Sequence, residues 1–118
     1  RTSQVEAQPI NENELRLRYM EVLQDWKYCA RKMTDFPYAS YNIGNIYVKM
    51  KDFKSAIEAY TEATKRDSSM PEAYFNRGVA NILNGHIDEG LADLSQAGEM
   101  GLYQAYNLIK TYSKSKSK

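Results

Sequence analysis

The sequence predicts an all-α solenoid of about six helices, in which antiparallel helix pairs stack into a right-handed superhelix. Three observations predict this fold. Residues 37–44 (PYASYNIG) are followed, 34 residues later, by the similar segment 71–78 (PEAYFNRG). Within each copy, apolar residues recur at the three- and four-residue spacing of a helix. Glycine and proline stand mainly where helices are expected to begin, end or cross.

Each copy of this repeat is expected to contain two helices. The first copy covers residues 37–70, and the second covers residues 71–101. Pro71 suits the first turn of a helix, where its missing N–H costs little. The 34-residue offset also relates the pairs Ala39 and Ala73, Asn42 and Asn76, Gly44 and Gly78, and Ala63 and Ala97. The expected helices are, in chain order, 39–50, 53–66, 73–83 and 87–99.

Small residues within these helices predict close helix crossings. Gly44 and Gly78 lie inside the first helix of each copy, where glycine costs about 1 kcal/mol relative to alanine. A close approach of two backbones would offset that cost. Ala56 and Gly90 are expected to serve the same purpose on the second helices.

The repeat resembles the tetratricopeptide repeat, which has a period of 34 residues and a pattern of aromatic, Leu, Gly, Tyr, Ala and Pro positions. The matching residues are, in the first copy, Ile43, Gly44, Tyr47, Ala56, Tyr60 and Ala63, and in the second, Tyr74, Gly78 and Ala97; Leu94 stands at the second aromatic position of the second copy. The departures are Ser40, Ser68, Asn81, Gly90 and Gly98. The resemblance implies that the first helices line a concave groove and that the second helices lie outside.

The segment before the two copies, residues 11–36, is expected to form one helix that caps the array as half of a decayed repeat. Its apolar residues recur every three or four positions: Leu15, Tyr19, Val22, Trp26, Cys29 and Met33. Val22, Trp26 and Cys29 are in phase with Ala56, Tyr60 and Ala63 of the first copy. Cys29, the single cysteine, is expected to be a small buried residue without a redox role.

Residues 102–112 are expected to form a single capping helix at the other end. The junction that leads into it, residues 97–108, resembles the related Sel1-like repeat. Residues 1–10 and the Ser-Lys-rich segment 113–118 are expected to be flexible. The domain of residues 11–112 is therefore expected to be the C-terminal part of a longer repeat protein.

Composition argues against several classes of function. Sixteen Lys and Arg residues oppose 15 Asp and Glu residues, which leaves no basic face for nucleic acid. No apolar run is long enough for insertion into a membrane. The only histidine, His86, has no cysteine near it in the sequence, so a Cys/His metal site is not expected. No phosphate-binding glycine motif and no catalytic set occur, so neither a cofactor nor an enzymatic activity is expected.

The resemblance implies a binding groove on the first helices and the capping helix. Its expected residues are Tyr38, Tyr41, Asn45, Val48, Lys49, Glu72, Phe75, Asn76, Val79, Ile82, Leu83, Tyr106 and Lys110. Some members of the family hold a peptide C-terminus in a carboxylate clamp of Asn, Lys and Arg. Asn45 and Asn76 match its amide positions, whereas Tyr41, Tyr103 and Asn107 replace its basic residues. The resemblance therefore favours recognition of apolar or extended segments over capture of an acidic tail.

These observations predict a non-catalytic adaptor module that binds a protein or peptide partner. The alternative is a structural module that forms homo-oligomers through the apolar groove or an end of the array. The sequence names neither the partner nor the compartment: a cytoplasmic location is the expectation, and an exported one stays open.

Overall fold

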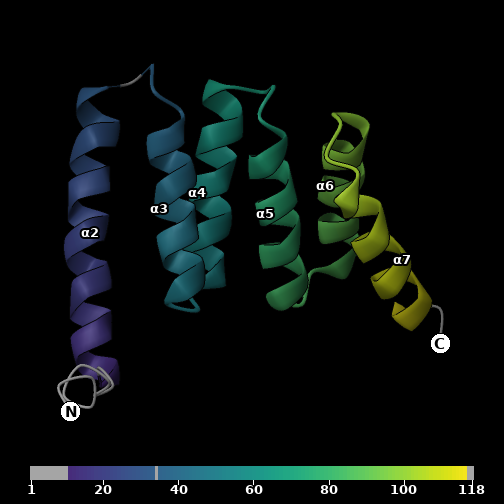
Figure 1. Cartoon of the computed structure of the whole chain (residues 1–118), viewed down its shortest axis with the longest axis horizontal. Coiled ribbons are helices and arrows are strands. Elements are labelled where there is room, and N and C mark those ends of the chain that lie inside the picture. Colours follow the sequence, from purple (N-terminus) through teal and green to yellow (C-terminus); the bar gives the residue numbers. More distant parts are fainter. Residues whose placement is uncertain (1–10, 34, 117–118) are drawn as a thin grey trace, which may run out of the picture.

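The structure is a computed structural model that describes residues 11–33 and 35–116 (Figure 1). These residues form six α-helices and no strand, which confirms the predicted all-α class. The helices are α2 (Glu12–Lys32), α3 (Tyr38–Lys49), α4 (Phe53–Arg66), α5 (Pro71–Leu83), α6 (Ile87–Glu99) and α7 (Gln104–Lys116). Residues 1–10, which were expected to be flexible, lie outside the described residues. None of the described helices is both long and apolar enough to span a bilayer.

The helix boundaries follow the repeat period closely. Helices α4 and α6 have the predicted bounds, and α3 and α5 begin one or two residues earlier than expected. Helix α7 departs further, because it continues to Lys116 and includes residues expected to belong to a flexible tail. Neither glycine nor proline interrupts the sequence after Gln104, so nothing in it ends the helix at residue 112.

The turn between the helices of each copy requires a left-handed backbone conformation. Gly85, between α5 and α6, has φ 90°, which glycine adopts without a steric penalty. Lys51 occupies the same place between α3 and α4 and has φ 62°. A lysine in this conformation costs roughly 1–2 kcal/mol because its Cβ approaches the following carbonyl oxygen. The following residue, Asp52, caps α4 by accepting a hydrogen bond from the Ser55 N–H at 3.2 Å.

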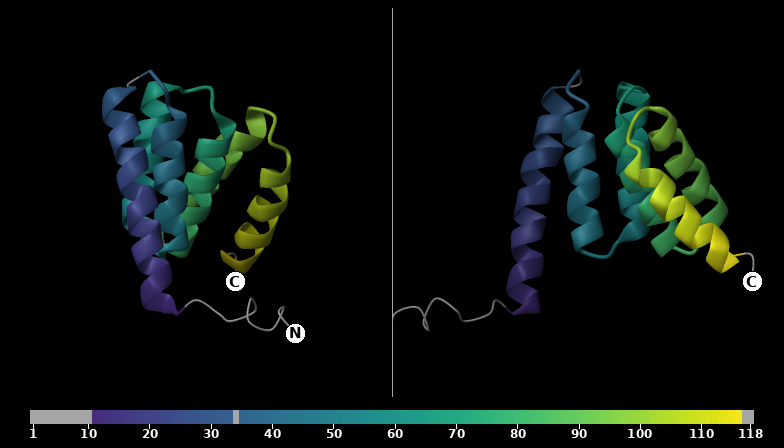
Figure 2. Two further views of the ribbon diagram at one scale, coloured as in Figure 1. Left: turned by 60° about the vertical axis from the view of Figure 1, so that its left-hand side comes forward. Right: turned by 45° about the vertical axis from the view of Figure 1, so that its right-hand side comes forward.

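The helices form a row in which each packs against the next, as Figure 1 shows. Helix α3 also contacts α5, so the first helices of the two copies are neighbours. The two views of Figure 2 show α7 inclined relative to the helices before it. This arrangement places the residues of α3 and α5 on adjacent surfaces, where a shared site can form.

The predicted close crossings are present. A Cβ added to Gly44 would lie 2.5 Å from the ring of Tyr60, and one added to Gly78 would lie 2.8 Å from the carbonyl oxygen of Gly90. Both distances are too short for a side chain. Tyr60, only 1% exposed, therefore fills the space that Gly44 leaves between α3 and α4.

An ion pair accompanies the apolar packing between α5 and α6. The Arg77 guanidinium donates to both carboxylate oxygens of Asp93, at 2.8 and 2.9 Å, and Asn81 donates to the same carboxylate at 3.1 Å. The hydrogen bond with Asp93 raises the pKa of Arg77, against the opposing effect of burial. The departure from the repeat pattern at Asn81 thus supplies a polar partner for a half-buried charge.

The predicted cap at α2 is only partly correct. Leu23, outside the predicted stripe, is the buried residue of α2, whereas Leu15, Val22 and Met33 are 37%, 40% and 49% exposed. Cys29 is half-buried, not buried as predicted. The physical reason is that α2 packs against one neighbouring helix, α3, whereas α4, whose apolar spacing α2 shares, packs against both α3 and α5. One flank of the α2 stripe therefore faces solvent.

Candidate functional site

A hollow of about 410 Å³ lies between α3 and α5, with α4 beneath it. Its wall is apolar where Val48, Phe75 and Val79 line it, and Lys49 is the only cationic residue among its lining residues. The remaining lining residues are Asn45, Asn76 and Tyr60. The hollow thus combines an apolar surface with three side chains that can form hydrogen bonds.

A network of hydrogen bonds joins the three helices around this hollow. The Tyr60 hydroxyl, from α4, donates to Oδ1 of Asn45 on α3. Nδ2 of Asn76, on α5, donates to the same Oδ1 at 3.0 Å and to the Tyr41 hydroxyl at 3.1 Å. Because neighbouring hydrogen bonds constrain one another, the network fixes the orientation of both amide groups.

Burial keeps the phenol of Tyr60 neutral. It raises the pKa of Tyr60 well above the ordinary value of 10.0, and nearby Tyr41 adds to the effect. The Asn76 amide acts in the opposite direction but is outweighed. Tyr60 is therefore a hydrogen-bond donor throughout the physiological pH range, and the Asn45 oxygen stays occupied.

An aromatic run leads from the start of α3 to the hollow. The ring centroids of Tyr38 and Tyr41 are 6.0 Å apart, and those of Tyr41 and Tyr60 are 5.9 Å apart. The Tyr38 ring is 43% exposed, whereas Tyr60 is buried. The run therefore offers an exposed aromatic surface that adjoins the hollow.

The structure brings together only part of the predicted groove. Six of the seven lining residues of the hollow were predicted from the sequence: Asn45, Val48, Lys49, Phe75, Asn76 and Val79. The others do not line it: Tyr38, Tyr41, Glu72, Ile82, Leu83, Tyr106 and Lys110. Ile82 instead packs close to Gly90, and Tyr106 covers Gly98, so both belong to helix crossings. Tyr60, the seventh lining residue, was predicted only as a packing residue.

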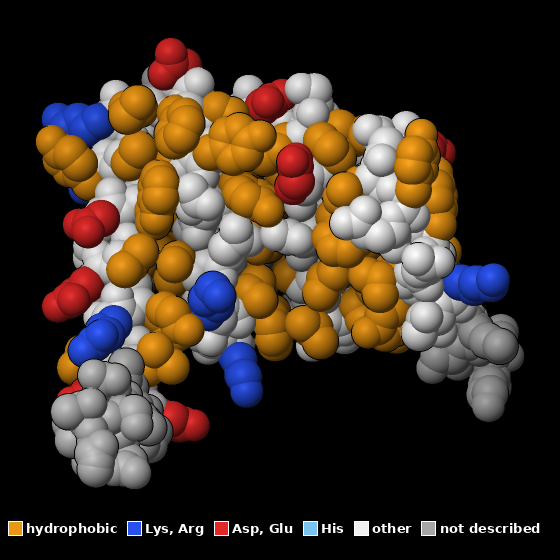
Figure 3. Space-filling view, viewed as in Figure 1, with side chains coloured by type: hydrophobic (Ala, Val, Ile, Leu, Met, Phe, Trp, Pro, Cys, Tyr) orange, Lys and Arg blue, Asp and Glu red, His pale blue; other side chains and the backbone are white. Residues whose placement is uncertain are grey.

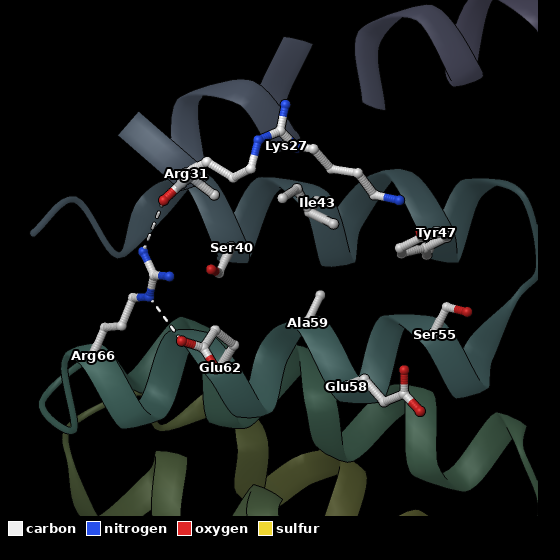
Figure 4. Close-up of a pocket in the computed structure, with 11 residues that line it drawn as sticks. Lys27, Arg31, Ser40, Ile43, Tyr47, Ser55, Glu58, Ala59, Glu62 and Arg66 are labelled. Carbon is white, nitrogen blue, oxygen red and sulfur yellow. Dashed lines mark hydrogen bonds and ion pairs between the residues drawn. The ribbon is translucent and has the colours of Figure 1, made fainter. Parts of the chain in front are cut away.

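A second hollow, of about 350 Å³, lies among α2, α3 and α4 and has a more charged lining (Figure 4). There Arg66 forms an ion pair with Glu62 at 2.9 Å and donates to the carbonyl oxygen of Ala30 at 3.3 Å. The Lys27 ammonium lies 5.7 Å from the centroid of the Tyr47 ring. We call this second hollow the outer hollow. Because its cationic groups Arg66 and Lys27 already contact protein groups, it is the weaker candidate for a binding site.

Two further observations bear on the kind of site present. On the face seen in Figure 1, hydrophobic side chains extend from α2 to α7, and most charged side chains lie near its edges (Figure 3). Among the residues that the structure describes, no group of three His, Cys, Asp or Glu side chains is placed to hold a metal ion.

Comparison with solved structures decides the fold. The chain matches the first TPR of Spaghetti (RPAP3), bound to the HSP90 peptide SRMEEVD, with a TM-score of 0.80 and 20% identity; the match covers 86% of this chain and 82% of that one. It also matches MamA with a TM-score of 0.77 and 19% identity, covering 98% and 74% of the two chains. The chain has a tetratricopeptide-repeat fold. At these levels of identity, the similarity concerns the fold alone.

Sequence comparisons agree with the tetratricopeptide-repeat fold. Residues 44–85 match the family model described as TPR repeat. Over 57 residues, the chain is 30% identical to an NADPH oxidase activator of Dictyostelium discoideum and 37% identical to Hsp70-Hsp90 organizing protein 2 of Arabidopsis thaliana. Each match covers 48% of this chain but only 9% and 10% of the respective relatives. The matched TPR segment contains the second half of α3 and the whole of α4 and α5, and all three helices contribute to the hollow.

Proposed function

We propose that the chain is a non-catalytic adaptor module that binds a peptide segment of a partner protein in the hollow between α3 and α5. The observation that carries the proposal is the pairing of an apolar wall, formed by Val48, Phe75 and Val79, with the amide groups of Asn45 and Asn76. Peptides need both features, because their side chains gain from apolar burial and their backbone must keep its hydrogen bonds.

The names of two similar proteins support this proposal. The first TPR of Spaghetti was solved with an HSP90 peptide, and a second relative is named an Hsp70-Hsp90 organizing protein. Both descriptions concern association with other proteins. For this chain they support the class of function, a protein-binding TPR module, and the hollow supplies the candidate site.

The test begins with peptides selected against the wild-type protein from a randomised display library and titrated by fluorescence anisotropy. The double variant Asn45→Asp with Lys49→Glu changes two lining residues of the hollow that lie outside the apolar core. It is expected to weaken binding by roughly tenfold or more, which corresponds to about 1.4 kcal/mol. Circular-dichroism melts establish that the variant remains folded.

A matched variant addresses the outer hollow. Arg31→Glu with Glu58→Lys also changes the charge of two lining residues, but these residues lie at the outer hollow, on α2 and α4. We expect it to bind the selected peptides with unchanged affinity. The site would be misassigned if only this control variant lost peptide binding, or if the variant Asn45→Asp with Lys49→Glu kept the wild-type affinity.

Self-association is the second candidate function, and the uncovered flank of α2 favours it. Leu15, Val22 and Met33 form an exposed apolar stripe, a feature typical of interaction surfaces. Sedimentation-velocity measurements across the micromolar range test it. If the protein is a monomer at all concentrations, self-association is excluded. If it forms a dimer, and the double variant Val22→Lys with Met33→Lys is a monomer, self-association through α2 is supported.

A further inference from the structure

The two copies of the repeat differ in the size of one side chain on their first helix. The first copy has Ser40 on α3, and the second copy has Tyr74 on α5, 34 residues later. The Tyr74 ring packs against the core around Leu94, and the Arg77 guanidinium lies 5.4 Å from the centroid of that ring. The first copy therefore lacks a ring that packs between the helices of the second copy.

Two neighbouring positions differ in the same direction. In the second copy, Arg77 and Asp93 form an ion pair at 2.8 Å, whereas the first copy has the uncharged and shorter side chains of Ile43 and Ala59 at these positions. Ser40, Ile43 and Ala59 all line the outer hollow of about 350 Å³. The outer hollow thus occupies the place that a ring and an ion pair fill in the second copy.

The lining of the outer hollow includes a hydroxyl group without a partner. Ser40 is only 4% exposed, and its hydroxyl forms no hydrogen bond with any of the described residues. Since no fully buried side-chain oxygen of the described residues lacks a partner, the Ser40 hydroxyl is open to the hollow that it lines. Figure 4 shows it on the side of α3 that faces α4. A ligand that brings its own hydrogen-bonding group would complete this hydroxyl.

The charges around the outer hollow lie on two sides. Lys27 and Arg31 come from α2 on one side, and Glu58 comes from α4 on the other (Figure 4). In the part of the chain that the structure describes, neither Lys27 nor Arg31 forms an ion pair with a carboxylate. The α2 side of the opening is therefore complementary to an acidic group.

We propose that the outer hollow binds one tyrosine side chain of a partner protein that has an acidic residue two positions away. The ring takes the place that Tyr74 has in the second copy, and its hydroxyl forms a hydrogen bond with Ser40. Side chains two residues apart in an extended segment point the same way, so the acidic group lies near Lys27 and Arg31. This site holds a single side chain and is separate from the peptide site between α3 and α5.

The first test uses an isolated ring. N-acetyltyrosine amide, which is uncharged, is titrated into the ¹⁵N-labelled full chain and followed by nuclear magnetic resonance. A ligand this small binds weakly, so saturation is expected roughly in the millimolar range. The backbone amides of Ser40, Ile43 and Ala59 are expected to shift, and N-acetylleucine amide is expected to shift them much less. Unshifted amides at these three residues, or equal shifts with both probes, would overturn the proposal.

Two substitutions at Ser40 test the place and the hydroxyl. Ser40→Tyr puts the residue of the second copy into the first and is expected to abolish binding of the tyrosine probe. Ser40→Ala keeps the hollow and the fold but removes the hydroxyl, so it is expected to weaken the tyrosine probe about threefold or more and to leave N-acetylphenylalanine amide unchanged. Wild-type affinity for the tyrosine probe in Ser40→Ala, or in a folded Ser40→Tyr protein, would contradict the assignment.

The acidic neighbour is tested with two peptides at low ionic strength, acetyl-Asp-Gly-Tyr-amide and acetyl-Lys-Gly-Tyr-amide. The aspartate peptide is expected to bind about threefold or more tightly than the lysine peptide. This preference should disappear in Arg31→Gln but persist in Lys32→Gln, because Lys32 does not line the outer hollow. A wild-type protein that binds the lysine peptide as tightly would refute the acidic neighbour.

A second copy of the chain also carries exposed tyrosines, Tyr28 and Tyr103, which are 56% and 72% exposed. Sedimentation velocity of wild type and Ser40→Tyr separates this occupant from a different partner. The proposal expects the two proteins to have the same oligomeric state. A dimer that Ser40→Tyr converts to a monomer would show that a second copy fills the outer hollow and would overturn the proposal.

Discussion

The Tyr60 hydroxyl donates a hydrogen bond to the carboxamide oxygen of Asn45, so a residue of α4 sets the orientation of an amide on α3. Tyr60 stands at an aromatic position of the repeat pattern, and its ring fills the space opposite Gly44. One side chain therefore both packs the helix pair and organises the polar side of the hollow. This relationship connects the stability of the fold with the proposed recognition.

Replacing Tyr60 with phenylalanine separates these two roles. Tyr60→Phe keeps the ring against Gly44 but removes the donor to Asn45. We expect the free energy of unfolding to fall by about 0.5–1.5 kcal/mol, the usual net value of a hydrogen bond, as measured by urea denaturation. Tyr103→Phe is the control, because Tyr103 is 72% exposed and should lose almost nothing. Equal effects of the two substitutions would argue against the hydrogen bond.

Tyr60 also predicts a loss of stability at alkaline pH. Its pKa is raised in the folded state, so the folded protein holds this proton more tightly than the unfolded chain does. The contribution is complete below the unfolded-state pKa of about 10 and decreases as the pH rises above it. Comparing urea denaturation at about pH 8 and about pH 11 should show a larger loss for wild type than for Tyr60→Phe. Identical losses of stability in the wild type and in Tyr60→Phe would show that Tyr60 does not cause the alkaline destabilisation.

The close crossing of α5 and α6 predicts that adding a single methyl group at Gly78 destabilises the protein. Gly78→Ala gains about 1 kcal/mol of helix propensity but places a Cβ against the Gly90 carbonyl oxygen. Because that atom belongs to the backbone, relief requires the helices to separate, and overpacking of this kind costs typically 1–3 kcal/mol. We expect a lower melting temperature by calorimetry. The exposed control Gln96→Ala on α6 should not lower it, and a more stable Gly78→Ala protein would contradict the close crossing.

The turn between α3 and α4 predicts a stabilising substitution. Lys51→Gly relieves the left-handed strain at φ 62° and restores the residue type that the second copy has at Gly85. The expected gain is up to about 1 kcal/mol, since glycine also increases the entropy of the unfolded chain. Lys54→Gly, in the exposed first turn of α4, is the matched change and should destabilise instead. Opposite signs for the two lysines in thermal denaturation are the outcome to look for.

Much of the fold could be predicted because the repeat period is a local signal. The 34-residue offset locates α3 to α6, and the glycines mark their crossings. How far other helices bury the apolar face of α2 could not be predicted in the same way. Val22 and Trp26 have the spacing of their equivalents in α4, but whether a second helix covers that face depends on the rest of the array. The Sel1-like junction stays a prediction, since the matching family model ends at residue 85.

The sequence predicted most of the residues that line the hollow, but not the hydrogen bonds among them. Asn45, Asn76, Phe75 and Val79 were expected in the groove because of the resemblance to the repeat family. Tyr60 was missed as a lining residue, since its pattern position indicates packing and the direction of its hydroxyl depends on tertiary contacts. Which amide atoms stay available depends on the partners of both asparagines, and one of those partners, Tyr41, lies a full repeat away from Asn76 in sequence.

The most direct test of peptide binding between α3 and α5 is a nuclear magnetic resonance titration of the ¹⁵N-labelled protein with a selected peptide. The side-chain amide of Asn45 and the backbone amides of Phe75 and Val79 are predicted to shift progressively and to saturate together. The amides of Arg31 and Glu58, at the outer hollow, are predicted to stay unchanged. Shifts confined to the outer hollow or to α2, with Asn45 and Phe75 unaffected, would contradict the account.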